Sequence, residues 1–276
     1  MTAATAVQQR RGARLNVRLT TLLWSVIVGL IVLFLLAPII VVIIGSFSDQ
    51  AYLVFPPKGL SVRWYLQVLS SREFMDSAAV SLELGVLAAS ASTVIGIMAA
   101  LGTTGQRGRS ADVLMAVLSA PLLVPGIVVG IAMLFYFTDI HLGATFTALV
   151  LAHTVLTLPY VVRSVAAGLE TIDHSAEEAA RSLGAGRFRT TITITLPMIK
   201  GNVLAGAVFA FIISFDEVVV TLFLASPRVT TLPVRIYNYI AYTSDPSIAA
   251  VSTMMIVATT ALVLAIDRYV GFVRLF

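Results

Sequence analysis

The sequence contains no cysteine and few charged residues, and both absences narrow the classes of protein to which it can belong. Without cysteine, neither a disulfide nor a thiolate metal site can form. Charged residues make up 12% of the 276 residues, whereas a water-soluble domain normally carries about 25%. The chain is 58% hydrophobic, with a mean hydropathy of +0.97. These few charges cannot cover a water-exposed surface, so lipid is the expected solvent for most of the chain.

Sequence motifs of several enzyme classes are missing as well. Only two lysines occur, Lys58 and Lys200, and neither follows a glycine, which excludes a Gly-x-x-x-x-Gly-Lys phosphate-binding loop. Neither His-Glu-x-x-His nor Gly-x-Ser-x-Gly is present. The three histidines, His141, His153 and His174, are too scattered to form a metal cluster. We therefore expect no catalytic activity, no cofactor and no resident metal.

The sequence does contain six apolar segments of about twenty residues or more, the length that a bilayer core requires. They are residues 21–45, 77–101, 111–137, 144–168, 201–224 and 248–270. Arginines precede the first segment, as in a signal peptide, but that segment is too long and no Ala-x-Ala site follows it. The predicted fold class is therefore all-α, a polytopic membrane protein with six transmembrane helices.

The basic residues predict the orientation of these spans. With both termini in the cytoplasm, the inner segments hold twelve lysines and arginines and the outer segments five, as the positive-inside rule requires. The net charge of +4 then reflects topology, and no nucleic-acid partner is expected. The predicted organisation is a cytoplasmic tail at 1–20, a first helix and outer loop at 21–75, a core at 76–270 with a cytoplasmic loop at 170–200, and a cytoplasmic C-terminus at 271–276.

Prolines and aromatic residues give two further expectations that the sequence leaves open. Prolines inside predicted spans either line a cavity at a kink or simply bend a packed helix; they are Pro38, Pro121, Pro125 and Pro159. In the outer loop, Trp64 and Tyr65 are expected at the level of the lipid headgroups. The outer segment 225–247 suits contact with a soluble protein, a gate, or an ordinary interfacial helix.

The polar loop between the fourth and fifth spans is the most informative part of the chain. It is about thirty residues long, far longer than most connections between helices. Ser175 and Glu178 have the spacing of a capping box that starts a helix. Small residues then leave a surface with little side-chain bulk, which a partner's backbone can approach, and arginines surround it; they are Ala179, Ala180, Gly184, Ala185 and Gly186, with Arg181, Arg187 and Arg189. An amphipathic helix lying on lipid is the alternative, but only Leu183 and Phe188 could form its apolar face.

This loop resembles the cytoplasmic loop of the permeases of binding-protein-dependent ABC importers. The shared pattern is Glu-Ala-Ala, three residues, Gly, nine residues and Ile-x-Leu-Pro, matched here by Glu178, Ala179, Ala180, Gly184, Ile194, Leu196 and Pro197. The resemblance implies the fold of type I ABC importer permeases. It also implies that the loop, with Ala185, docks into an ATPase subunit. The expected partners are a homologous permease, two ATP-binding ATPase subunits and a periplasmic solute-binding protein, assembled in the bacterial inner membrane.

Ionisable residues on three predicted spans lie at one predicted depth. With a rise of about 1.5 Å per residue, Glu83, His153 and the Asp216-Glu217 pair all fall about 10–13 Å from the outer surface. Adjacent residues on a helix point about 100° apart, so only one of the acidic pair can face a given point. Unpaired carboxylates in a membrane protonate or await a cation, which favours a pathway for cationic or amine-bearing solutes. A buried structural cluster is the alternative, above all for His153.

A narrower resemblance concerns the solute. Residues 211–224, FIISFDEVVVTLFL, followed by LPVRIY at 232–237, are similar to the permeases of polyamine importers, in particular the second permease subunit for spermidine and putrescine. Related permeases for opines, aminobutyrate, phosphonates, iron or thiamine remain alternatives. A proton-coupled secondary transporter is the rival class, but no internal repeat is found and the small-residue loop would have no purpose. A structural scaffold would need no acidic layer.

Overall fold

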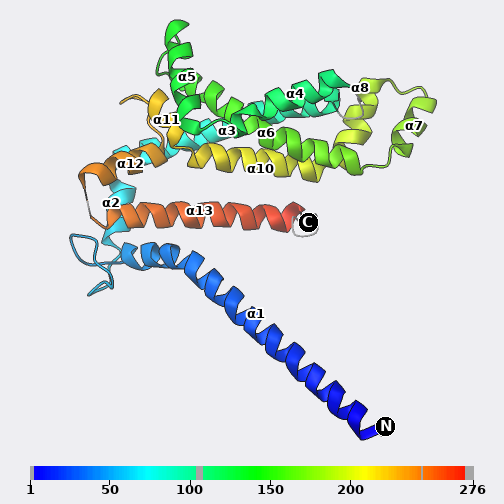
Figure 1. The fold of residues 1–276 in the computed structure, drawn as a ribbon. Coiled ribbons are helices and arrows are strands. Elements are labelled where there is room, and N and C mark those ends of the chain that lie inside the picture. The colour runs from blue at the N-terminus through cyan, green and yellow to red at the C-terminus, as the bar shows by residue number, and fades with distance from the viewer. Residues whose placement is uncertain (1–2, 104–107, 244, 271–276) are drawn as a thin grey trace. The chain divides into compact units, whose positions relative to one another are not determined.

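The structure is a computed structural model, and it describes residues 3–103, 108–243 and 245–270. The ordered elements within these ranges are helices (Figure 1). Four are long and apolar enough to cross a membrane: residues 21–46 of α1 (Ala3–Ser46), α3 (Arg72–Thr103), α6 (Phe146–Thr171) and residues 247–265 of α13 (Ser247–Val270). Two bent helix pairs raise the number of spans to six if each pair is one span. The helical prediction is confirmed, while the predicted C-terminus at 271–276 lies outside the described residues.

The third predicted span is a bent pair. Helix α4 (Arg109–Ser119) continues as the 3-10 turn η1 (Ala120–Leu122), and the chain then bends by 100° into α5 (Gly126–Asp139). A residue before proline avoids the helical region, so Val124, which precedes Pro125, disfavours continuation of the helical segment that ends at Leu122. The predicted continuous span 111–137 is therefore wrong in shape, although its prolines correctly marked the bend.

The fifth predicted span, 201–224, is also corrected by the structure. Helix α10 (Lys200–Asp216) ends eight residues early, because Glu217 is extended, with φ −69° and ψ 121°. A separate short helix, α11 (Val219–Leu224), follows this break. The run of valines after Glu217 has weak helix propensity, which favours a break at this point. A second bend, of 75°, separates Lys200 from the helical segment before it.

The chain divides into two compact units, residues 1–66 with 244–253 and residues 67–243 with 254–276. In the first unit, the apolar side chains of α1 between Leu22 and Leu36 are almost all exposed, as expected for a lipid-facing helix. Trp64 is 7% exposed and donates its indole N–H to the carbonyl of Ser48 at 2.8 Å. The Tyr65 hydroxyl hydrogen-bonds Ser46 at 2.6 Å. Trp64 is thus a packing residue within its own unit.

In the second unit, α3, α6 and α10 pack closely through glycines. A Cβ on Gly96 of α3 would lie 2.7 Å from the Val161 side chain of α6, and one on Gly206 of α10 would lie 3.1 Å from the Cα of Val161. Small residues are the usual means of close helix packing in membranes, where no hydrophobic effect drives association. Further along, Gly85 of α3 meets the ring of Phe211 of α10. Numbers fall along α3 as they rise along α10, so the two helices are antiparallel.

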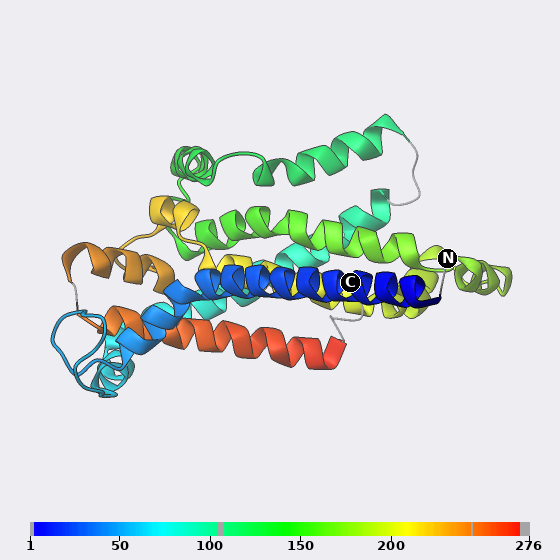
Figure 2. The same ribbon diagram turned by 60° about the horizontal axis from the view of Figure 1, so that its bottom comes forward.

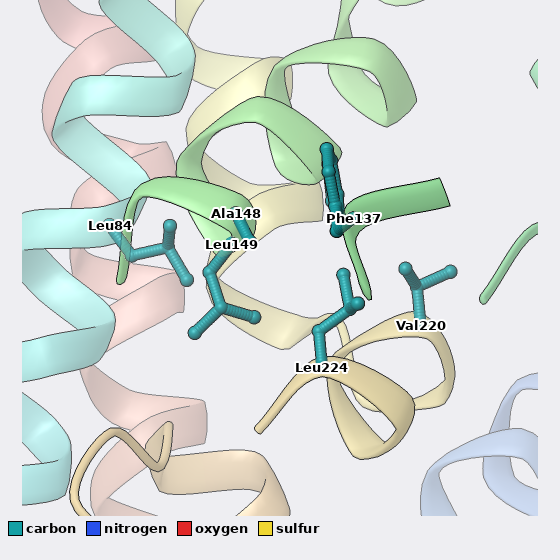
Figure 3. Packing of buried hydrophobic residues seen from close by; sticks show 7 residues of the cluster. Leu84, Phe137, Ala148, Leu149, Val220 and Leu224 are labelled. Atoms are coloured by element: carbon teal, nitrogen blue, oxygen red, sulfur yellow. The ribbon is translucent and has the colours of Figure 1, made fainter. Parts of the chain in front are cut away.

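A cluster of buried apolar residues joins α5 and α11, the second parts of the two broken spans, to this bundle. Leu84, Ala148, Leu149 and Ala152 from α3 and α6 pack with Phe137, Val220 and Leu224 from α5 and α11 (Figure 3). Gly130 of α5 lies directly against Val220 and Phe223 of α11.

Helix α12 (Leu232–Tyr242) is fixed to α3 by polar contacts. The guanidinium of Arg235 contacts Glu73 at 3.1 Å, and the backbone N–H of Leu232 donates to the hydroxyl of Ser81 at 2.8 Å. The rings of Phe74 and Tyr239 lie 5.4 Å apart. Helix α12 is therefore anchored to α3 at both of its ends.

Gly206→Leu is expected to destabilise the bundle, because the new side chain would collide with the backbone of α6. Overpacking of this kind costs about 1–3 kcal/mol. Gly102→Leu is the matched control, since a Cβ at Gly102 meets nothing within 4 Å. Thermal unfolding in detergent should show a lower midpoint for Gly206→Leu alone; equal midpoints would contradict the close packing at this glycine.

Candidate functional site

The loop after α6 folds into a short helix, α7 (Ser175–Ser182), which projects past the end of α6 in both views (Figures 1 and 2). The predicted helix is confirmed, but the predicted capping box is wrong. The residue at the N-cap position is His174, whose side chain makes no capping bond. The carboxylate of Asp173 instead accepts from the backbone N–H of Ser175 at 2.9 Å and from the Ser175 hydroxyl at 2.7 Å. These bonds, the backbone one first, hold the pKa of Asp173 below its usual value.

Helix α7 ends in a turn that requires glycine at position 184. Gly184 has φ +89°, a left-handed conformation that side-chain-bearing residues rarely adopt. The N–H of Gly184 bonds the carbonyl of Arg181 at 2.9 Å, and the N–H of Ala185 bonds that of Ala180 at 3.0 Å. This pair of bonds is the Schellman motif, which satisfies the last carbonyls of a helix. Gly184 in the family pattern therefore has a backbone role in addition to its lack of bulk.

The surface around this turn is exposed and contains two large apolar side chains. Glu178, Ala179 and Gly184 are exposed, while Ala180 and Ala185 are half-buried. Leu183 is 90% exposed and Phe188 is 80% exposed. Sequence reasoning treated these two residues only as too few for a lipid-binding face. Their position in the sequence on either side of the bare turn at Gly184 was the signal that was missed.

One contact ties α7 to the end of the loop. The hydroxyl of Thr195 donates to the carboxylate of Glu177 at 2.5 Å, across 18 residues of sequence. The imidazole of His174 lies 3.2 Å from the other oxygen of the same carboxylate. The Thr195 bond, supported by His174 and Arg181, lowers the pKa of Glu177. We call the pair Glu177 and Thr195 the loop brace; its carboxylate stays ionised at neutral pH.

The rest of the family pattern leads from the brace into the bundle. Helix α8 (Arg187–Thr190) continues as the π-helix η2 (Thr191–Thr195) and α9 (Leu196–Met198). Ile194 is half-buried and Pro197 is exposed. Leu196 packs against the buried cluster of α3, α6 and α10 that contains Ile199. Leu196 thus links the loop to α10, whereas the exposed residues around Gly184 are free to contact a partner.

The heights of the residues of the predicted acidic layer can be compared along the bundle, and they differ by up to about 8 Å. From the level at which Gly96, Val161 and Gly206 meet, the helical rise places His153 about 12 Å, Asp216 about 15 Å and Glu83 about 20 Å further along α6, α10 and α3. All three displacements have the same direction, because α10 runs antiparallel to α3 and α6. Glu83 and Asp216 are exposed on their helices.

The environments of these ionisable residues differ. His153 is fully buried, with Nδ1 2.8 Å from the hydroxyl of Ser214 and Nε2 2.9 Å from that of Thr221. Glu217 is half-buried, and its carboxylate accepts from the backbone N–H of Val220 at 2.8 Å. The structure therefore gives His153 and Glu217 packing contacts and leaves Glu83 and Asp216 at the surface of the bundle.

Taken together, the apolar helices joined by an exposed small-residue loop define a polytopic membrane protein. The comparison with known proteins identifies the family. Residues 92–274 match the family described as binding-protein-dependent transport system inner membrane component, and the chain belongs to this family. It is a permease subunit of an ABC importer, a class of transporter subunit rather than an enzyme.

Several curated relatives are permeases of polyamine importers. The chain is 30% identical to the putrescine transport system permease protein PotI of Escherichia coli K12, over 84% of this chain and 85% of the relative. It is also 30% identical to the spermidine/putrescine permease PotC of the same organism, over 84% and 88%. A molybdenum transport system permease, ModB of Mycobacterium bovis, is 33% identical over 68% of this chain and 77% of its own length.

Solved structures confirm the predicted permease fold. A bacterial ABC transporter that imports the acidic polysaccharide alginate matches with a TM-score of 0.71 at 18% identity, over 91% of this chain and 96% of that one. The MetNI methionine transporter matches with a TM-score of 0.62 at 18% identity, over 74% and 99%. At such identities the likeness concerns the fold alone.

The loop brace can be tested by a double-mutant cycle with Glu177→Ala and Thr195→Val. Each single change removes the same hydrogen bond, so we expect the double variant to be no worse than the more damaging single one. ATP-driven uptake and thermal unfolding in the assembled transporter are the two readouts. Glu177→Gln is the control, since its amide oxygen still accepts from the Thr195 hydroxyl. Additive losses would show that the two residues act separately.

Proposed function

We propose that this chain forms half of the translocation pathway of an ATP-driven importer for a polyamine or a similar small cationic amine. The observation that carries the proposal is the 30% identity to two polyamine permeases over most of the chain. The carboxylates on the bundle support a cationic solute. Glu83 and Asp216 are exposed on apolar helices, and neither has an ion-pair partner among the described residues. Charged groups at such depth are costly and are retained where they act on a solute or ion.

The charge of the layer also discriminates between the relatives. An anionic solute would be repelled by unpaired carboxylates, whereas an ammonium group forms charge-assisted hydrogen bonds with them. This favours the polyamine relatives over the molybdenum permease as guides to the solute. Within the importer class, other amine-bearing solutes such as opines or aminobutyrate would use the same chemistry.

The energy for transport would come from a separate subunit, because this chain has no phosphate-binding loop. We assign the surface around Gly184, with Leu183 and Phe188 beside it, as the site where an ATPase subunit docks. A homologous permease would complete the pathway, and a periplasmic binding protein would deliver the solute. In this proposal the loop lies in the cytoplasm and the chain in the inner membrane, with both termini on the cytoplasmic side.

The contacts of the loop suggest how ATPase movement would reach the pathway. A displacement of α7 would be transmitted through the hydrogen bond of the loop brace, from Glu177 in α7 to Thr195 at the end of η2. The next residue, Leu196, packs against the bundle, and α10 begins after Ile199. Helix α10 ends at Asp216, so one continuous path of contacts connects the docking surface to the acidic layer. Rocking of α10 would alternate the access of that layer between the two sides of the membrane.

Uptake into vesicles tests this function. We expect proteoliposomes that contain this chain, its permease partner, the ATPase and the binding protein to accumulate radiolabelled putrescine or spermidine only with ATP. A proton gradient without ATP should drive no uptake. Uptake by the gradient alone would instead establish a proton-coupled secondary transporter, and ATP-driven uptake of other solutes only would refute the polyamine assignment.

Gly184→Leu is expected to uncouple transport while the protein remains inserted in the membrane. The new side chain adds bulk to the docking surface, and the left-handed conformation costs about 1–2 kcal/mol for a side-chain-bearing residue. ATP-driven uptake and co-purification of the ATPase should both fall. Wild-type uptake in this variant would count against docking at the turn.

Two control variants separate bulk from backbone strain. Gly184→Asn introduces a residue that tolerates positive φ, so the turn is retained and the loss should be smaller. Gly186→Leu adds the same bulk where φ is −69°, a conformation open to any residue. If bulk prevents docking, Gly186→Leu should also weaken co-purification of the ATPase. If only strain matters, it should behave as wild type.

A further inference from the structure

The break between α10 and α11 separates two adjacent carboxylates that a continuous helix would have kept about 100° apart. Asp216 is the last residue of α10, and Glu217 is extended. The backbone changes direction between these two residues, so their side chains lie in different surroundings. Their contacts show which of them the fold itself uses.

Glu217 is used by the fold. Its Oε1 accepts from the backbone N–H of Val220 at 2.8 Å, and its carbonyl accepts from the hydroxyl of Thr221 at 3.1 Å. The first N–H groups of a helix lack partners within the helix, and an acceptor side chain just before them satisfies one. Glu217 therefore caps α11, and this contact can be made by any side chain with a suitably placed oxygen.

His153 fixes the break from the other side. Its ring bridges the hydroxyl of Ser214, two residues before Asp216, and that of Thr221 in α11. The hydroxyl proton of Thr221 is donated to the carbonyl of Glu217, so this hydroxyl accepts from the N–H at Nε2, and Nδ1 of the neutral ring accepts from the hydroxyl of Ser214. The bridge therefore ties both sides of the break to α6 and limits the directions that Asp216 can take.

Asp216, in contrast, neither caps a helix nor bridges two elements. It is exposed, and among the described residues no hydrogen bond or ion pair to its carboxylate is found. We propose that the break divides the acidic pair between two roles: Glu217 caps α11, and Asp216, positioned by the His153 bridge, is the carboxylate that contacts an ammonium group of the solute. This assignment rests on the proposed transport of a cationic amine.

Uptake by amide variants tests the division of roles in the assembled transporter. Asp216→Asn should reduce ATP-driven putrescine uptake by about tenfold or more, the factor expected for the loss of one charge-assisted hydrogen bond. Glu217→Gln should transport like the wild type, because its amide oxygen can still accept from Val220. The reverse pattern, with Glu217→Gln inactive and Asp216→Asn active, would overturn the proposal.

Thermal unfolding supplies a readout that does not depend on the solute. Glu217→Ala removes the cap and should lower the unfolding midpoint, whereas Glu217→Gln and Asp216→Asn should leave it near that of the wild type. An unchanged midpoint in Glu217→Ala would refute the capping role.

The absence of cysteine from the chain allows a direct test of where position 216 lies. Asp216→Cys should react with a membrane-impermeant cationic thiosulfonate, and saturating putrescine should slow the reaction. Val94→Cys is the control: Val94 is 60% exposed within α3, where a lipid-facing thiol should not react with a water-soluble reagent. An unreactive Asp216→Cys would show that this side chain does not line an aqueous pathway.

The role of the His153 bridge in positioning Asp216 is tested by the same labelling reaction. Ser214→Ala removes one of the two hydrogen bonds of the bridge and keeps the contact between Thr221 and the Glu217 carbonyl. In the Asp216→Cys background it should reduce the protection that putrescine gives. Unchanged protection would refute the positioning role of the bridge. If the wild type takes up no polyamine at all, the proposed solute fails, while labelling without putrescine and the unfolding midpoints still decide the roles of Asp216 and Glu217.

Discussion

The structure depends on one constraint, that backbone N–H and C=O groups within a bilayer have no water to bond and must find partners in the protein. Continuous helices satisfy this constraint automatically, but a broken helix does not. The third predicted span is broken between Leu122 and Gly126, and the fifth is broken between Asp216 and Val219. At the fifth, the carboxylate of Glu217 and the hydroxyl of Thr221 supply the partners that the interrupted helix lacks. A polar residue within a predicted span can thus supply a hydrogen-bond partner to the backbone.

The same constraint explains why the broken helices pack against each other. Helix α11 is too short to be stable alone, since an isolated helix needs about 12–15 residues in water. It is held by α5, through the close contact of Gly130 with Phe223, and by His153 of α6. Helices α5 and α11 and the buried His153 therefore pack together, and this packing fixes the position at which α10 ends.

The sequence predicted the architecture well where the signal was local. The apolar segments, the bend at Pro125 and the helix that starts at Ser175 were all indicated by residues within a few positions. The predicted capping box of Ser175 and Glu178 was wrong because Asp173, two residues before Ser175, has a carboxylate that accepts from the backbone N–H of Ser175 instead. The break at Glu217 was missed because the apolar run continues to Leu224, and a hydropathy pattern does not distinguish a span from a span with an interruption.

Contacts between distant residues could not be predicted in the same way. Glu177 meets Thr195 only because the Schellman turn at Gly184 reverses the chain between them. The bridging role of His153 likewise needs Ser214 and Thr221, which are more than sixty residues away. These long-range contacts change the meaning of the acidic pair. On a continuous helix Asp216 and Glu217 are equivalent candidates, whereas around a capped break only the residue that the backbone does not require remains free for a ligand.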